Sequence, residues 1–145
     1  MSTGQRGHGV HRDAITQVLA AVGDAAVVLS YEEDRSFAAA GLSRFSAVGS
    51  TRLDWQAAEV LERSTGFDGA ELRRLLRSHG GKGGLVIVFW GNLAVPSVGL
   101  EAAVAALHAE TLLDCSPQCW IYLTDSKVLI EFQDGEGFTV GRVPA

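Results

Sequence analysis

The sequence predicts an α+β fold, a single domain in which a mixed sheet packs against about four helices. Residues 85–90 read LVIVFW, and six apolar residues without alternation indicate a central buried strand that is covered on both faces. Three further strands with short turns between them follow near the C-terminus and predict an antiparallel three-stranded meander. Helical apolar stripes precede and separate these strands, without the regular strand–helix alternation of a doubly wound fold.

The length and composition of the chain agree with one domain. It has 145 residues, of which 47% are hydrophobic and 20% charged, and this balance excludes a disordered chain. No apolar run reaches the ~18 residues that a membrane span needs. Residues 1–10 are polar and glycine-rich, which predicts a flexible tail before a domain at 11–145 and argues against a secretory signal. We therefore expect a cytoplasmic protein with reduced cysteines.

Apolar spacing and capping residues define the elements before the central strand. The apolar residues of 15–22 follow the i, i+3, i+4, i+7 pattern of a helix, and Asp54 and Asp68 are suitable N-caps for two more. The expected elements are a helix over 13–22, a strand over 25–31, a charged turn over 32–35, a strand over 42–48, and helices over 54–64 and 68–79.

After the central strand, Ser97 is a suitable N-cap for an alanine-rich helix that ends at about residue 113. The strands of the meander are expected at 119–123, 128–132 and 138–143, with an Asp-Gly turn inside 134–137. The last of these strands is expected at the edge of the sheet. An exposed edge strand pairs readily with a second copy of the chain, so this strand is a candidate homodimer contact.

Charge is unevenly distributed along the sequence. Residues 1–83 hold ten acidic and ten basic side chains, whereas residues 84–145 hold seven acidic side chains against Lys127 and Arg142. The second part therefore carries the whole net charge of −5. A surface of one sign accelerates association with an oppositely charged partner, which favours a protein partner with a basic surface. The same charge is also typical of an acidic surface that only maintains solubility.

Eight residues are the candidates for binding such a partner. The acidic run after the first strand is the densest group of carboxylates, the meander adds three acids, and two aromatic residues share one face of its first strand. The candidates are Glu32, Glu33, Asp34, Trp120, Tyr122, Glu131, Asp134 and Glu136. The competing interpretation of the two aromatic residues is packing in the core.

The sequence disfavours several common chemistries. The glycine-rich stretch at 80–84 follows a helix and precedes a strand, which is the reverse of a phosphate-binding loop. Cys115 and Cys119 have a C-x3-C spacing and no second pair, so we expect no metal and no cofactor. The arginines of 73–77 lie on an acidic chain without interleaved aromatic residues, so we expect neither nucleic acid nor a membrane as a partner.

Two classes of function remain. The favoured one is a small acidic, non-enzymatic protein-binding module, such as an inhibitor or immunity-type protein that neutralises a cationic toxin or nuclease. A chaperone or adaptor for a secreted protein is a variant of this class. The alternative is a small-ligand-binding protein or enzyme whose site is assembled from dispersed residues. Its candidates are Glu32, Glu33, His79, His108 and Cys115.

Overall fold

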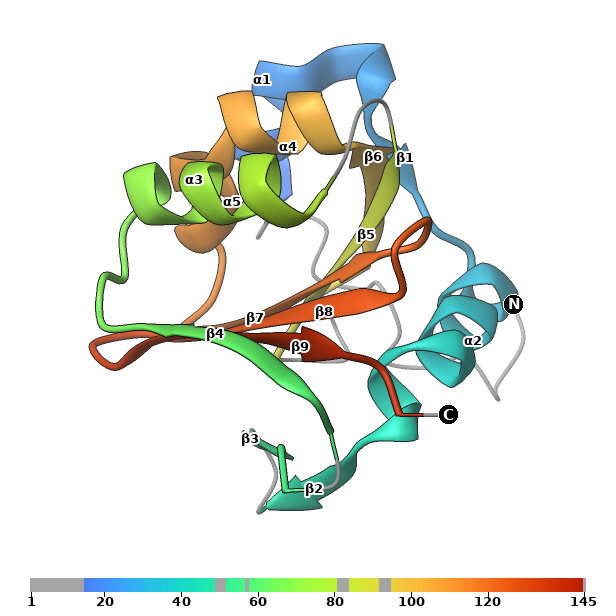
Figure 1. The fold of residues 1–145 in the computed structure, drawn as a ribbon. Helices are drawn as coiled ribbons and strands as arrows, with labels where there is room; N and C mark the ends of the chain where they lie inside the picture. Colours follow the sequence, from blue (N-terminus) through green and yellow to red (C-terminus); the bar gives the residue numbers. More distant parts are fainter. Residues whose placement is uncertain (1–14, 49–51, 57, 81–83, 92–94, 145) are drawn as a thin grey trace.

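The computed structural model describes residues 15–48, 52–56, 58–80, 84–91 and 95–144. Within these residues the predicted α+β single domain is confirmed, and it is built around one seven-stranded sheet (Figure 1). The tail predicted at residues 1–10 lies outside the described residues.

The strands of the main sheet lie side by side in the order β1-β6-β5-β7-β8-β9-β4. Their bounds are β1 Val27–Val28, β4 Val60–Ser64, β5 Leu85–Trp90, β6 Val98–Glu101, β7 Gln118–Leu123, β8 Val128–Gln133 and β9 Gly137–Arg142. A separate hairpin consists of β2 Ser46–Val48 and β3 Arg52–Asp54. All pairings among the described strands are antiparallel, where the sequence predicted a mixed sheet.

Helices lie over both faces of the sheet (Figure 1). The bounds of the helices are α1 Thr16–Val22, α2 Tyr31–Ala40, α3 Gly69–His79, α4 Ala102–Leu107 and α5 Ala109–Leu113, with short 3-10 turns η3 Gly23–Ala25 and η4 Leu42–Arg44. In Figure 1, α1, α3, α4 and α5 lie over one face, whereas α2 and the β2–β3 hairpin lie over the other. Alternate residues of each strand therefore enter two separate apolar clusters.

The predicted central strand and meander are confirmed. β5 pairs with β6 on one side and with β7 on the other, and residues 86–90 are buried on both faces. The meander forms by pairing of β7 with β8 and of β8 with β9. Gly135 and Gly137 in the turn have φ angles of 77° and 125°, which side-chain-bearing residues rarely adopt.

The charged turn predicted at 32–35 is the first turn of α2. Ser30 and Glu33 form a capping box, in which the Glu33 amide donates to Ser30 Oγ at 3.1 Å and the Ser30 amide donates to Glu33 Oε1 at 2.8 Å. The carboxylates of the run also suit the positive end of a helix. Of the strand predicted over 25–31, only the two residues of β1 form a strand.

Two predicted helices contain strands instead. The segment 54–64 has helical spacing but ends in β4, because pairing with β9 outweighs a weak local preference. The segment after Ser97 begins as β6, and the helix that follows is interrupted at His108 (φ −109°, ψ 27°) between α4 and α5. The strand predicted over 42–48 is reduced to η4 and β2.

The strand predicted to lie at the sheet edge, residues 138–143, is an interior strand. β9 pairs with β8 on one side and β4 on the other, so it has no free edge for a homodimer contact. The edges of the sheet are β1 and β4, and β4 carries Glu62 and Arg63 and an irregularity in its pairing. Charges and bulges of this kind protect an edge from pairing with another chain.

In the described part of the chain, none of the helices combines the length and apolar character of a membrane span.

The close approach of the β8–β9 turn to β4 depends on Gly137. A Cβ at this position would lie 2.0 Å from the Ser64 carbonyl oxygen, whereas a Cβ at Gly135 would meet nothing within 4 Å. We expect Gly137→Ala to lower the free energy of unfolding by about 3 kcal/mol, because backbone strain and a backbone clash add. Gly135→Ala should cost about 1 kcal/mol, since only the positive φ is affected. Urea denaturation of both variants measures this difference, and equal losses would contradict it.

Candidate functional site

A cleft with a volume of about 470 Å³ opens between the β2–β3 hairpin and the nearby end of the sheet. We call it the hairpin cleft. The hairpin supplies one wall, β4 and the residue after it supply another, and β8, β9 and their turn supply the floor. The lining residues are Arg52, Leu53, Asp54, Trp55, Arg63, Ser64, Thr65, Glu131, Gln133, Glu136, Gly137, Phe138 and Thr139.

The floor of the hairpin cleft is a polar continuation of an apolar sheet face. Leu129, Glu131 and Gln133 alternate along β8 and therefore point to the same side of the sheet. Leu129 belongs to the apolar cluster under α2 and the hairpin, whereas Glu131 and Gln133 are polar although only 5% and 6% exposed. A buried polar group is costly unless it is hydrogen-bonded, so its partners identify the forces that shape the site.

Three N–H groups surround the Glu131 carboxylate. The Trp55 indole donates to Oε1 at 2.9 Å, and the Leu53 amide and the Trp120 indole donate to Oε2 at 2.8 and 2.9 Å. Two of these donors come from the hairpin and its following residue, and one comes from β7. Among the described residues, no arginine, lysine or histidine nitrogen lies within 4.0 Å of this carboxylate. Its hydrogen-bond donors are therefore all neutral, and Arg52 of β3 adds a weaker attraction between opposite charges at longer range.

Trp55 reaches Glu131 because β9 has a glycine beneath it. A Cβ at Gly141 would lie 2.7 Å from the Trp55 ring, so any larger residue would displace the indole. Phe45 packs edge-on against the same ring, with centroids 4.7 Å apart. Apolar packing thus fixes the indole whose N–H binds the carboxylate.

The rim of the hairpin cleft carries charges of both signs. Arg52 forms an ion pair with Glu136, and this hydrogen bond lowers the pKa of the Glu136 carboxyl. Arg63 donates to the Thr139 hydroxyl at 3.5 Å, a long contact. Asp54 Oδ1 accepts a hydrogen bond from the backbone of the residue two positions later, as is typical of turns.

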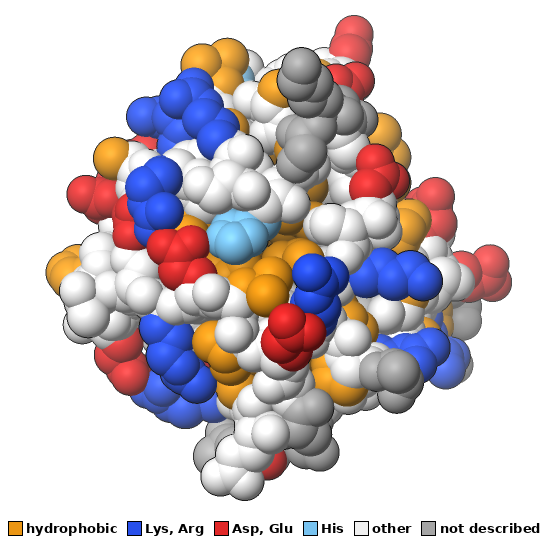
Figure 2. All heavy atoms as spheres, in the orientation of Figure 1, with side chains coloured by type: hydrophobic (Ala, Val, Ile, Leu, Met, Phe, Trp, Pro, Cys, Tyr) orange, Lys and Arg blue, Asp and Glu red, His pale blue; other side chains and the backbone are white. Residues whose placement is uncertain are grey.

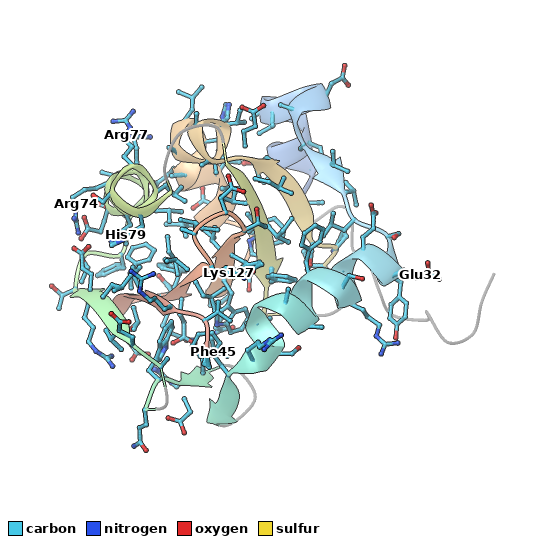
Figure 3. All side chains as sticks on the ribbon, turned by 45° about the vertical axis from the view of Figure 1, so that its right-hand side comes forward. Glu32, Phe45, Arg74, Arg77, His79 and Lys127 are labelled. Carbon is cyan, nitrogen blue, oxygen red and sulfur yellow. The ribbon has the colours of Figure 1, made fainter. Side chains whose placement is uncertain are left out.

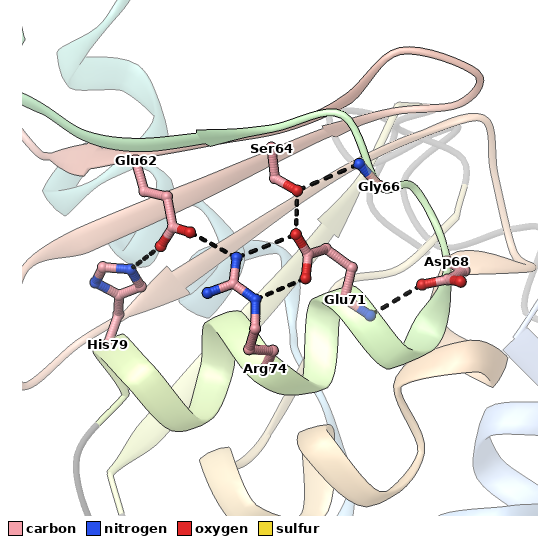
Figure 4. Close-up of polar contacts among 7 residues, drawn as sticks. All are labelled: Glu62, Ser64, Gly66, Asp68, Glu71, Arg74 and His79. Atoms are coloured by element: carbon pink, nitrogen blue, oxygen red, sulfur yellow. Dashed lines mark hydrogen bonds and ion pairs between the residues drawn. The ribbon is translucent and has the colours of Figure 1, made fainter.

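A second polar cluster, the α3–β4 seam, joins the edge strand to a helix (Figure 4). Arg74 bridges Glu62 of β4 at 2.5 Å and Glu71 of its own helix at 2.7 Å. His79 contacts the same Glu62 at 3.0 Å, and the Ser64 hydroxyl donates to Glu71. The seam holds β4, one wall of the hairpin cleft, against α3.

The α3–β4 seam lacks the properties of a nucleophilic site. Ser64 lines the hairpin cleft and its hydroxyl contacts Glu71, which would have to act as the base. Hydrogen bonds from Arg74 and Ser64 lower the pKa of Glu71 from 4.5 to about 2, so this carboxylate is a poor proton acceptor. His79 is engaged with Glu62 on the helix-covered side of β4. These contacts favour a structural role for the seam.

The acidic run predicted as a binding site lies at the start of α2 and does not line the hairpin cleft. Glu33 caps its own helix, and Asp34 accepts a hydrogen bond from the Ser97 hydroxyl at 3.0 Å. Glu32 is exposed and lies at the opposite end of α2 from Phe45 (Figure 3). The structure therefore divides the eight candidates between two places.

Of the five candidates from the meander, Glu131 and Glu136 line the hairpin cleft, and three of the five are buried. Trp120 and Tyr122 are 6% and 4% exposed and pack in the core, which agrees with the competing interpretation of these two aromatic residues and not with a surface contact. Glu131 is buried, so it is not part of an acidic surface. Asp134 and Glu136 are exposed in the β8–β9 turn, and Glu136 lines the cleft.

The dispersed residues of the alternative hypothesis do not converge. Among the described residues, no hydrogen bond joins any two of the five, and no group of three or more His, Cys, Asp or Glu side chains could hold a metal ion. Cys115 donates to the Thr111 carbonyl, and burial raises the pKa of its thiol to about 11, so the reactive thiolate is disfavoured.

The acidic and basic parts of the sequence are not separate parts of the molecule. Glu136 from the acidic part pairs with Arg52, and Arg142 pairs with Glu59 at 3.3 Å. Figure 2 shows acidic and basic side chains intermingled on one face, with basic side chains gathered over α3. The uneven charge along the sequence therefore does not by itself define an acidic face.

Sequence reasoning missed the residues that β3, the residue after it and β4 contribute to the site. Arg52, Trp55 and Arg63 fell in or next to a predicted helix, and nothing local marked them as neighbours of the meander. One signal was available, because Glu131 interrupts the otherwise apolar run of residues 128–132. A single acid inside a buried strand indicates a carboxylate with dedicated hydrogen-bond donors.

Comparison of the chain with known protein families finds no family model that matches, and a comparison with curated proteins finds no match either.

Glu131→Gln tests whether the carboxylate holds the hairpin on the sheet. The amide has one acceptor oxygen in place of two, so at least one indole N–H loses its partner, and we expect a loss of about 3 kcal/mol in the free energy of unfolding. Glu136→Gln in the adjacent turn should leave stability near that of the wild type, because its ion pair is exposed. Chemical denaturation measures both, and equal stability of the two variants would contradict the role of Glu131.

The α3–β4 seam should make stability depend on pH in the acid range. Because folding lowers the pKa values of Glu71 and Glu62, their contribution is fully present above 4.5 and is lost as the pH falls toward 2. Glu71→Gln should therefore be less stable than the wild type at pH 6, with a difference that narrows toward pH 2. Glu32→Gln on the exposed face of α2 is the matched control, and thermal unfolding between pH 2 and 6 provides the measurement. A constant difference for Glu71→Gln would exclude the linkage.

Proposed function

We propose that this chain is a non-enzymatic protein-binding module that recognises a basic segment of a partner protein in the hairpin cleft. One observation carries the proposal: a buried carboxylate, Glu131, lies on the floor of an open cleft, and all of its hydrogen-bond donors are neutral. A group of opposite charge from a partner would complete this arrangement. The net charge of −5 would accelerate the encounter with a basic partner.

Inhibitors and immunity-type proteins that neutralise a cationic toxin or nuclease are the members of this class that the charge favours. A chaperone or adaptor for a basic secreted protein would use the same surface. A cytoplasmic location is part of the proposal and agrees with two free cysteines, Cys115 and Cys119.

The second candidate function is binding of a small molecule. The cleft volume of about 470 Å³ supports it, because it falls inside the range of typical ligand sites. A small ligand would be captured from a filtered low-molecular-weight extract, whereas a protein partner would be retained only from the macromolecular fraction.

Affinity capture with matched variants tests the proposed function. The double variant Asp54→Asn/Glu136→Gln removes two charges from the hairpin cleft, and Glu32→Gln/Asp134→Asn removes two charges from positions that do not line it. We expect the wild type and the second variant to capture the same basic protein at low salt, and the first variant to lose it. Capture should also decline in high salt, because exposed charges are screened. A partner retained equally by both double variants would place the interface elsewhere.

A further inference from the structure

We infer that the hairpin cleft is a guanidinium site, so that the group it takes from a partner is an arginine side chain. This inference rests on the proposed function and names the chemistry of the contact. It follows from three features of the cleft: an unused acceptor position on a buried carboxylate, an excess of acid among the lining residues, and an indole in the wall.

The first feature is the remaining hydrogen-bonding capacity of Glu131. A carboxylate has about four acceptor positions, two on each oxygen. Oε2 receives two N–H donors, whereas Oε1 receives only the Trp55 indole. Because Glu131 lines the hairpin cleft, a donor in the cleft can use the second position on Oε1. A charged donor gains most there, since a hydrogen bond between opposite charges is stronger than one between neutral groups.

The second feature is the balance of charge. Asp54, Glu131 and Glu136 line the hairpin cleft together with Arg52 and Arg63. Arg52 is already paired with Glu136 at the exposed rim and acts on Glu131 only at longer range, so neither Glu131 nor Asp54 has a cation within 4.0 Å among the described side chains. An anionic ligand could contact Arg63 at the edge, but it would then approach the buried charge of Glu131. The floor of the cleft therefore favours a cation.

The third feature selects arginine over lysine. Trp55 is in the wall of the hairpin cleft, next to Asp54 and hydrogen-bonded to Glu131. A guanidinium is planar, carries five donors in fixed directions and stacks on aromatic faces, whereas an ammonium is compact and more strongly hydrated. A planar cation can contact an indole and two carboxylates together, which a lysine does less well.

The three tryptophans provide a direct test in the intact protein. The indole N–H groups of Trp55 and Trp120 both donate to Glu131, whereas that of Trp90 donates to the Leu112 carbonyl under the opposite face of the sheet. Titration of the ¹⁵N-labelled chain with acetyl-arginine amide should move the Trp55 and Trp120 indole signals and leave the Trp90 signal unchanged. Acetyl-citrulline amide, which has the same shape without the charge, should move none of them.

Single substitutions provide a second test of the guanidinium site. Glu131→Gln should weaken binding of acetyl-arginine amide by about tenfold or more, because a hydrogen bond to a charged group is lost. Asp54→Asn, which keeps the acceptor for its own turn, should weaken it by about threefold and covers the case in which Glu131→Gln does not fold. Glu32→Gln changes the charge equally outside the hairpin cleft and should leave the affinity unchanged.

Several results would overturn the inference. These are an equal response to the citrulline analogue, a response to acetyl-glutamate amide in place of the arginine compound, movement of Trp90 together with the other two signals, or no response at millimolar concentration. If the titration fails while affinity capture still depends on the cleft, the guanidinium inference is wrong and the proposed function stands. If the titration succeeds and capture is independent of the cleft, the proposed function is wrong and the guanidinium site stands.

Discussion

The carboxylate of Glu131 holds the β2–β3 hairpin on the sheet, and the hairpin cleft exists because of that attachment. Its donors come from Leu53 and Trp55 on one side and from Trp120 on the other, so one buried charge links three segments. Among the described side chains, Leu53 of β3 and Phe45 just before β2 pack into the apolar cluster on this face of the sheet. Without the charged acceptor, the two indole N–H groups would be buried without partners, at a cost of about 1–3 kcal/mol each.

The order of the strands decides which charges meet. β4, from the middle of the chain, pairs with β9, and this brings residues of the neutral part of the sequence beside residues of the acidic part. Arg52 and Arg63 consequently lie at the same cleft as Glu131 and Glu136. The whole molecule still has more acidic than basic side chains. At the hairpin cleft, however, the acid that stands out is one buried carboxylate, and the rim around it carries charges of both signs. A binding role therefore depends on the geometry of one site more than on a uniform acidic face.

Elements with strong local signals were predicted well, and the rest depended on distant contacts. The run at 85–90 and the Asp-Gly turn of the meander identified β5 and β7–β9, and Asp68 with Glu71 identified the start of α3. β4 was predicted as a helix, because its strand character comes from pairing with β9 and not from its own residues. Of the cleft, Glu131 and Glu136 were predicted, but Trp55 was not, because its position depends on the bare backbone of Gly141.

The contacts that assemble the hairpin cleft join residues far apart in the sequence. The hydrogen bond from Trp55 to Glu131 spans 76 positions, and the pair Arg52–Glu136 spans 84. During synthesis from the N-terminus, the hairpin and β4 leave the ribosome well before β8 and β9 exist to receive them. Loop closure of this length is slow relative to local helix formation. The cleft is therefore among the last features to form in a newly made chain. A partner that binds in the cleft would bind only molecules in which the sheet is complete.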